Sequence, residues 1–219
     1  MVQVKICGVT RLEDARAAIA AGADFAGLVF HRASPRHVQP DQANSLAAQL
    51  RGRMRVVAVL ADATDSAVAQ AVSAADPDFL QLHGGETPER AAFIRARFGK
   101  PVIKALAIAG ETDFARLAAY DDVADMLLFD AKGPAGAVRG GHGRAFDWQL
   151  LRTRTIRKPW LLGGGLDCGN VARAIATAGA PGVDVSSGVE KAPGVKSAEA
   201  ISAFVAAARA AELERVSPS

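Results

Sequence analysis

Cysteine is scarce in this sequence: its 219 residues include only Cys7 and Cys168. The two stand far apart, and neither belongs to a Cys-x-x-Cys pair, the spacing typical of structural zinc sites and many redox sites. A disulfide framework would also need more cysteines than this. The sequence therefore predicts reduced thiols, no metal site, and a fold that is stabilised by its hydrophobic core.

Long hydrophobic runs, blocks of like charge and aromatic residues are also lacking. Uninterrupted apolar runs are no longer than residues 56–61, far short of the roughly 20 residues of a membrane helix. The net charge is only +3, the basic residues are scattered, and 5% of residues are aromatic. Nucleic-acid binding would favour a cationic stripe with stacking aromatics. Because residues 1–6 also fit a strand better than a secretory signal, we expect a cytoplasmic protein that binds neither membranes nor nucleic acid.

Short apolar segments alternate with alanine-rich segments along the whole chain. The apolar segments predict eight strands, at residues 2–6, 25–29, 55–60, 79–82, 101–106, 126–129, 160–162 and 183–185. Helical periodicity predicts helices at residues 12–21, 42–50, 66–75, 88–98, 113–119, 171–177 and 198–213, with a short helix or turn after residue 146. Residues suited to cap these helices are Asp65, Thr87, Thr112 and Ser197.

Eight strand–helix units with no break in composition predict an α/β fold, a single (β/α)8 TIM barrel domain over residues 1–219. The alternative is an open, doubly wound sheet, which usually has fewer units and often carries a glycine fingerprint for dinucleotides. Neither Gly-x-Gly-x-x-Gly after the first strand nor a phosphate-binding P-loop motif occurs here. The barrel is therefore the favoured fold.

Polar residues occupy alternate positions of several predicted strands, among them Lys5, Gln81, Lys104 and Asp184. Alternate residues of a barrel strand face its interior. These side chains could line a polar mouth, where Asp184 is a candidate substrate-binding residue. They could instead form buried ion pairs, such as Lys5 or Lys104 with Asp184, because a buried lysine normally requires a paired charge.

Two glycine-containing clusters, residues 163–165 and 186–188, directly follow the last two predicted strands. Barrel enzymes commonly bind phosphate at this position, through free backbone N–H groups and helix N-termini. The glycines could also serve only to make tight turns, but the coincidence of both clusters with this position favours a phosphate site. The candidate phosphate-binding residues are Gly164, Gly165, Ser186, Ser187 and Gly188.

Cys7 and Asp130 each stand at the carboxyl end of a predicted strand. A cysteine there is more often a small buried hydrophobe, and an aspartate is often a turn cap. The first and sixth strands lie three positions apart around an eight-strand ring, so both side chains could face one pocket. A thiolate base and a carboxylic acid would suit proton transfer on a sugar. Position alone leaves both interpretations open.

An ordered set of motifs carries a family resemblance from residue 2 to about residue 205. These motifs are residues 5–10, 22–24 with 27–30, 34–36, 81–84, 129–130, 143–148, 164–166 with 170–171, and 183–190 followed by 193–194. Together they resemble the phosphoribosylanthranilate isomerase family of tryptophan biosynthesis. The sequence departs from the family at Arg144, where a lysine is usual.

The resemblance implies an enzyme that catalyses an Amadori rearrangement of N-(5-phosphoribosyl)anthranilate to the 1-amino-1-deoxyribulose 5-phosphate, without nicotinamide, metal or other cofactor. Cys7 matches the family's general base, Asp130 its general acid, and Arg36 the arginine near the anthranilate carboxylate. Because a thiol base must ionise, we expect the pKa of Cys7 to lie below the free value of roughly 8.5. The partner is a small phosphorylated substrate, and the chain is a monomer or homodimer.

Two other functions are weighed against this one. A related barrel isomerase of the histidine pathway usually uses two aspartates, whereas Cys7 occupies one of the two positions here. A noncatalytic phosphate-binding barrel would be favoured by the loss of Cys7 or Asp130, and both are present. The glycine-rich segment of residues 131–145 is either a candidate lid or a plain surface loop. His83 is expected to support another group rather than to react, and Arg144 and Cys168 are assigned no role.

Overall fold

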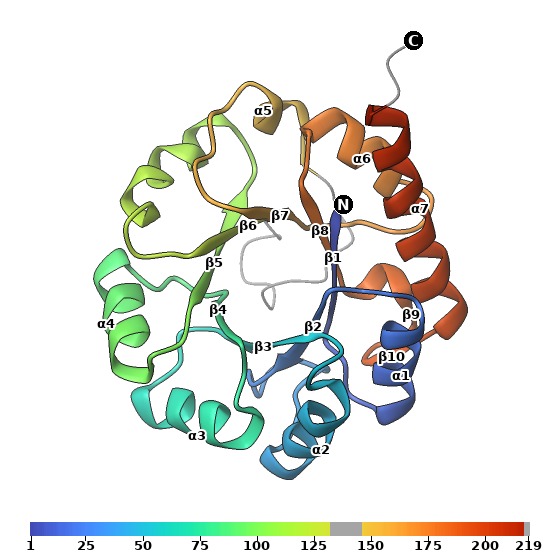
Figure 1. Ribbon diagram of the computed structural model, residues 1–219. Helices are drawn as coiled ribbons and strands as arrows, with labels where there is room; N and C mark the ends of the chain where they lie inside the picture. The colour runs from blue at the N-terminus through green and yellow to red at the C-terminus, as the bar shows by residue number, and fades with distance from the viewer. Residues whose placement is uncertain (132–145, 217–219) are drawn as a thin grey trace.

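The computed structural model describes residues 1–131 and 146–216, and its strands form one closed parallel barrel (Figure 1). The candidate lid and Arg144 therefore lie outside the described residues, apart from Ala131. Strand order around the barrel follows chain order, and β8 pairs with β1 to close the ring. The barrel strands are β1 (Gln3–Cys7), β2 (Phe25–Val29), β3 (Arg55–Leu60), β4 (Phe79–Leu82), β5 (Val102–Ile108), β6 (Met126–Ala131), β7 (Trp160–Leu162) and β8 (Gly182–Val185). The predicted barrel is thus confirmed.

Helices surround the barrel on its outside (Figure 1). They are α1 (Leu12–Ala20), α2 (Pro40–Leu50), α3 (Asp65–Ala75), α4 (Pro88–Phe98), α5 (Gln149–Arg152), α6 (Val171–Ala178) and α7 (Ala198–Val216). Thr87 and Ser197 cap α4 and α7 as predicted, accepting hydrogen bonds from the amides of Arg90 and Ala200. The cap predicted at Asp65 is wrong, because the Thr64 hydroxyl caps α3 and Asp65 lies in its first turn.

The helix predicted over residues 113–119 is instead a pair of 3₁₀ helices, η1 (Glu111–Arg116) and η2 (Ala118–Tyr120). Thr112 accordingly lies inside η1 and is not its cap. Phe114, Leu117 and Tyr120 are three residues apart, and a 3₁₀ helix places such residues on one face. Phe114 and Tyr120 are buried and Leu117 packs against the core. The two tighter helices therefore turn all three side chains toward the core, where Phe114 and Tyr120 are buried and Leu117 is partly buried.

Apolar side chains from the strands fill one part of the barrel interior. Its buried members include Phe25, Val57, Ile103, Leu128 and Leu161. A larger hydrophobic cluster lies between the strands and the helices. Polar side chains occupy the other end of the interior, where the carboxyl ends of the strands open into the loops. Among the described residues, no helix combines the length and the apolar character needed to cross a membrane.

One further element follows β8 and was not predicted. A short 3₁₀ helix, η3 (Ser187–Val189), leads into an antiparallel hairpin of β9 (Glu190–Ala192) and β10 (Val195–Lys196). The hydroxyl of Thr10 donates to the carbonyl of Gly194, and Arg11 donates to the carbonyl of Lys196. The hairpin therefore fastens the loop after β8 to the loop after β1.

Candidate active site

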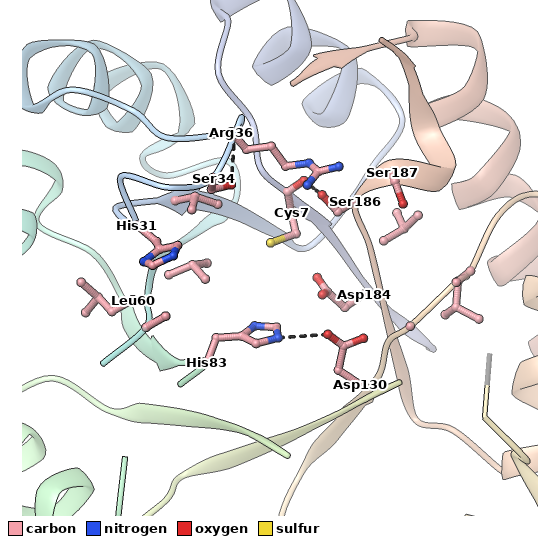
Figure 2. A pocket seen from close by; sticks show the side chains of 17 residues that line it. Cys7, His31, Ser34, Arg36, Leu60, His83, Asp130, Asp184, Ser186 and Ser187 are labelled. Carbon is pink, nitrogen blue, oxygen red and sulfur yellow. Dashed lines mark hydrogen bonds and ion pairs between the residues drawn. The ribbon is translucent and has the colours of Figure 1, made fainter. Parts of the chain in front are cut away.

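A pocket opens at the carboxyl ends of the strands, where an active site is expected in this fold (Figure 2). Eight of the nine predicted site residues line it: Cys7, Arg36, Asp130, Gly164, Gly165, Asp184, Ser186 and Ser187. His31, Ser34 and His83 also line the pocket. The predicted residues, which the chain separates widely, are therefore brought together by the barrel.

Gly188 is the predicted residue that does not line the pocket. A Cβ atom at this position would overlap the carbonyl oxygen of Leu166. Glycine thus lets the loop after β8 pack against the loop after β7, which carries Gly164 and Gly165. The structure therefore gives Gly188 a packing position against Leu166, where it brings the two loops together.

Cys7 ends β1 and is buried beside the ammonium group of Lys5. A Cβ placed on Gly27 of β2 would lie 2.9 Å from Cys7 Sγ and 3.3 Å from Lys5 Nζ, so glycine leaves room for both side chains. Burial raises the pKa of Cys7, and the charges of Lys5 and Lys196 only partly oppose this effect. The expected pKa below the free value is therefore wrong, because desolvation of the thiolate outweighs the nearby cations.

Lys5 and Asp184 form the ion pair that the sequence allowed. They are register partners on β1 and β8, and Lys5 Nζ lies 2.7 Å from Asp184 Oδ1. Burial alone would lower the pKa of Lys5, but Asp184 and Cys7 together outweigh this effect through their charges and hydrogen bonds and raise the pKa. Asp184 still contributes to the pocket wall.

Lys104 does not pair with Asp184, so that alternative is wrong. Lys104 Nζ lies 2.7 Å from Glu86 Oε2 in the loop after β4, and it also donates to the carbonyls of Leu82 and Gly84. The neighbours of β5 are β4 and β6, and Asp184 lies on β8, which is not adjacent to β5 in the ring. The partner of Lys104 was set by this neighbourhood, which strand parity alone does not reveal.

Asp130, near the end of β6, is held by two hydrogen bonds. Its Oδ1 accepts from the amide of Ala131 at 2.9 Å, and its Oδ2 lies 3.0 Å from Nε2 of His83 (Figure 2). The other ring nitrogen of His83 lies 2.8 Å from Nε2 of Gln81. The supporting position expected of His83 agrees with this arrangement.

The two loops after β7 and β8 present backbone amides to the pocket. Gly164 and Gly165 have φ angles of +84° and +66°, a left-handed conformation that glycine adopts without strain. The amides of Gly164, Gly165 and Ser187 form no backbone hydrogen bond with the described residues. Ser186 Oγ donates to the Cys7 carbonyl at 3.1 Å. Successive free amides of this kind form a concave site suited to an anion.

Arg36 is oriented by Glu190, a residue to which the sequence analysis gave no role. Its Nε and Nη2 donate to the two carboxylate oxygens of Glu190 at 2.7 and 2.8 Å. Lys196 Nζ lies 2.8 Å from the same carboxylate and donates to the carbonyl of Ser186. Burial alone would raise the pKa of Glu190, but Arg36 and Lys196 outweigh it and hold the pKa below its usual range. No short-range pattern marks this cluster, because its members meet only through the β9–β10 hairpin.

The described residues contain no group of three or more histidine, cysteine, aspartate or glutamate side chains placed to hold a metal ion. The pocket itself offers a buried thiol, a carboxyl group hydrogen-bonded to an imidazole, and an array of backbone amides.

Comparisons with known proteins agree with this geometry. The family model described as N-(5'-phosphoribosyl)anthranilate (PRA) isomerase matches residues 4–207. The enzyme of that name from Azorhizobium caulinodans is 52% identical over 212 residues, which cover 96% of this chain and 93% of the relative. The one from Rhodopseudomonas palustris strain BisB5 is 50% identical over 212 residues, covering 96% and 97%.

Solved structures give the same result. The crystal structure of phosphoribosyl anthranilate isomerase from Thermotoga maritima matches with a TM-score of 0.87 and 36% identity, covering 96% of this chain and 100% of that one. A crystal structure of a phosphoribosyl anthranilate isomerase in complex with reduced 1-(o-carboxyphenylamino)-1-deoxyribulose 5-phosphate matches with a TM-score of 0.83 and 34% identity, with the same coverage. The chain belongs to the phosphoribosylanthranilate isomerase family.

Proposed function

We propose that Cys7 is the general base and Asp130 the general acid of the Amadori rearrangement that this isomerase catalyses in tryptophan biosynthesis. The observation that carries the proposal is their placement, since Cys7 and Asp130 line one pocket from opposite sides, next to the amides of Gly164 and Gly165 (Figure 2). An acid and a base on two sides of a bound sugar can add a proton at one atom and remove another nearby.

The reaction moves protons without net oxidation. Asp130 protonates the ring oxygen of phosphoribosylanthranilate, the bond between that oxygen and C1 breaks, and an iminium ion forms. Cys7 then removes the proton from C2, and the electron pair of that bond forms the enolamine. Loss of the O2 proton and gain of one at C1 convert the enolamine into the ketone. At the end Cys7 has gained one proton and Asp130 has lost one.

The ionisation of Cys7 depends on Lys5. Burial raises the pKa of the thiol, whereas the charges of Lys5 and Lys196 favour the thiolate. The thiolate that forms beside Lys5 is poorly solvated, which makes it a stronger base than a thiolate in water. A small thiolate fraction is compatible with catalysis because each ionised thiol removes the proton more readily.

The ends of the substrate are proposed to bind two different parts of the pocket. The phosphate binds the amides of Gly164 and Gly165 and the loop of Ser186 and Ser187, while Asp184 accepts a hydrogen bond from a sugar hydroxyl. Arg36 binds the anthranilate carboxylate, because a planar guanidinium suits a planar carboxylate. Glu190 occupies Nε and Nη2 of Arg36, and Nη1 forms no hydrogen bond with the described residues, which leaves it for the substrate.

The acid–base roles are tested by Cys7→Ser and Asp130→Asn, with Cys168→Ser as the control because that thiol is exposed and outside the pocket. We expect kcat to fall roughly 100-fold or more for each of the first two variants, the usual cost of losing a general acid or base. Binding of the reduced product analogue and thermal stability should stay near the parent values. A Cys7→Ser or Asp130→Asn enzyme with normal turnover removes that residue from the mechanism.

The phosphate site is tested at Gly165. Gly165→Asp places a negative charge at the amides, whereas Gly165→Asn has the same size, tolerates a positive φ and carries no charge. We expect the KM of the aspartate variant to rise at least about tenfold above that of the asparagine variant, because like charges repel strongly in a poorly solvated site. Inorganic phosphate should inhibit the parent competitively. Equal KM values for the two variants, without inhibition by phosphate, would place the phosphate elsewhere.

We also propose a cytoplasmic location and a monomeric or homodimeric state. The Thermotoga maritima enzyme is described as dimeric, and monomers have been generated from it. Light scattering coupled to size-exclusion chromatography separates the two states for this chain, and a tetramer or larger assembly would contradict the proposal.

A further inference from the structure

Three side chains form a continuous hydrogen-bonded row from the barrel interior to the pocket. Gln81 Nε2 lies 2.8 Å from His83 Nδ1, and His83 Nε2 lies 3.0 Å from Asp130 Oδ2. Gln81 is fully buried, whereas His83 and Asp130 both line the pocket (Figure 2). Gln81 Oε1 is buried and has no hydrogen-bond partner among the described residues. A buried carboxamide with a free oxygen beside a histidine can present either a donor or an acceptor to the ring by rotating.

The acid role proposed for Asp130 creates a need that this row can meet. Asp130 loses a proton to the substrate in each turnover and must regain one before the next. The amide of Ala131, which hydrogen-bonds to Oδ1, cannot supply a proton. His83 is the titratable side chain that contacts the other oxygen, and 18% of its side chain is exposed at the pocket, so it can exchange protons with water.

The two protonation states of Asp130 require different hydrogen bonds from His83. When Asp130 is ionised, Nε2–H of a neutral His83 donates to Oδ2, and Nδ1 accepts from the Gln81 amide nitrogen. When Asp130 is protonated, its O–H donates a hydrogen bond to Nε2 of His83, which must then carry no hydrogen. The ring hydrogen then lies on Nδ1 and requires an acceptor, which Gln81 Oε1 becomes after the amide rotates.

We propose that His83 returns the proton to Asp130 and that rotation of the Gln81 amide selects the tautomer of His83 that fits each state. The neutral ring takes one proton from water and becomes an imidazolium, with Nδ1–H donating to Gln81 Oε1. The Nε2 proton then passes to Asp130 Oδ2. The products are a neutral imidazole and a carboxylic acid, so the step consumes one proton, while Cys7 releases the one that it took from C2. His83 acts through Asp130 and need not touch the substrate.

Two substitutions of His83 separate proton transfer from simple support. His83→Gln keeps an N–H group near the position of Nε2 but cannot carry a proton, whereas His83→Ala leaves space that imidazole can fill. We expect kcat to fall about tenfold or more in both, within the range for lost acid–base assistance, with unchanged affinity for the reduced product analogue. Added imidazole should raise the turnover of the alanine variant in proportion to its concentration and leave the glutamine variant unaffected.

Other outcomes overturn the inference. A glutamine variant that turns over at the parent rate shows that a hydrogen bond is enough, and an alanine variant that binds the analogue but ignores imidazole shows that His83 transfers no proton. If the alanine variant does not fold, the decision rests on His83→Gln and on Gln81→Met, which removes both amide atoms at similar length. Gln81→Met should lower kcat in the same direction, and parent-level turnover there refutes the role of Gln81.

The inference rests on the proposed acid role of Asp130, and the two can fail separately. An active Asp130→Asn enzyme refutes the acid role. An inactive Asp130→Asn enzyme beside a fully active His83→Gln enzyme refutes only the proton return through His83.

Discussion

Two charged clusters are buried in opposite parts of the barrel, and their difference separates a reactive site from a structural one. The Lys5 cluster comprises Lys5, Cys7 and Asp184, and the Lys104 cluster comprises Lys104, Glu86 and Tyr120. Each contains a fully buried lysine with its carboxylate partner 2.7 Å away. Cys7 and Asp184 line the pocket, whereas no member of the Lys104 cluster does.

The polar groups of the Lys104 cluster form hydrogen bonds with one another and with the neighbouring backbone. Glu86 accepts the amides of Asp62 and Gly84 in addition to Lys104, and the Tyr120 hydroxyl donates to the Glu86 carbonyl. Burial lowers the pKa of Lys104 despite the charge of Glu86, whereas Asp184 and Cys7 together raise the pKa of Lys5 against the same effect. An ion pair of the same length therefore secures a loop in one place and supports a reactive thiol in the other.

The largest expected effect is a loss of stability when a substitution disrupts the Lys104 cluster. Lys104→Met leaves the charge of Glu86 buried without its partner, which should cost about 3–5 kcal/mol of unfolding free energy. Urea denaturation measures this cost, and Lys104→Met combined with Glu86→Gln should recover part of it because the unpaired charge is gone. The folded single variant should keep its reactive Cys7. A loss below about 1 kcal/mol would mean that the backbone amides alone hold Glu86.

The reactivity of the Cys7 thiol should depend on the Lys5 cluster and not on the Lys104 cluster. The thiolate is the reactive form of Cys7, and the fraction of Cys7 in this form increases as the pH approaches the pKa of the thiol. Burial raises that pKa. Lys5→Met removes the cation that opposes this rise, so the pKa should increase further and alkylation by iodoacetamide near neutral pH should slow about tenfold for each added pKa unit. Lys104→Met is the matched control and should react at the parent rate. Similar slowing in both variants would show that the charge of Lys5 is not what favours the thiolate of Cys7.

The smallest effect concerns Glu190, whose ion pairs lie on the same side of the barrel as the Lys5 cluster. Because its pKa is lowered in the folded state, Glu190 contributes stability at pH values above the ordinary glutamate pKa. That contribution is lost as the pH falls through the lower, folded pKa. We expect Glu190→Gln to lower the free energy of unfolding by about 1–2 kcal/mol at pH 7. The free energy of unfolding of the variant should also fall less than that of the parent as the pH is lowered. Unfolding curves at pH 7 and pH 3 measure both, and parallel declines for parent and variant would exclude Glu190 as a source of acid sensitivity.

Much of the fold could be predicted from the sequence because the information is local. The strands at Phe25–Val29 and Arg55–Leu60 have the same bounds in the prediction and in the structure, because strands covered on both faces are largely apolar. The error at residues 113–119 arose because spacing by three fits either helix type over one or two turns. Packing of Phe114 and Tyr120 against the core then decided between them.

The site was predictable in its position but not in its electrostatics. Cys7, Asp130 and the glycine loops could be placed because a strand's carboxyl end identifies the mouth of the barrel. The partner of Lys104, the cluster of Arg36 with Glu190, and the raised pKa of Cys7 depend on which side chains meet across the ring. Those meetings are set by strand neighbourhood, hairpin geometry and burial, none of which a short stretch of sequence encodes.

The closure of the barrel has a consequence for the order in which the protein gains activity. Lys5 and Asp184 are 179 residues apart in the chain, and Thr10 and Gly194 are 184 apart. Such distant contacts carry the largest loop-closure entropy and form late when a chain folds. The carboxylate of Asp184 therefore reaches Lys5, the charged neighbour of Cys7, only when the first and last strands meet. During refolding, enzymatic turnover should recover later than the circular-dichroism signal of the helices. The recovery of turnover would then report on the final closure of the barrel.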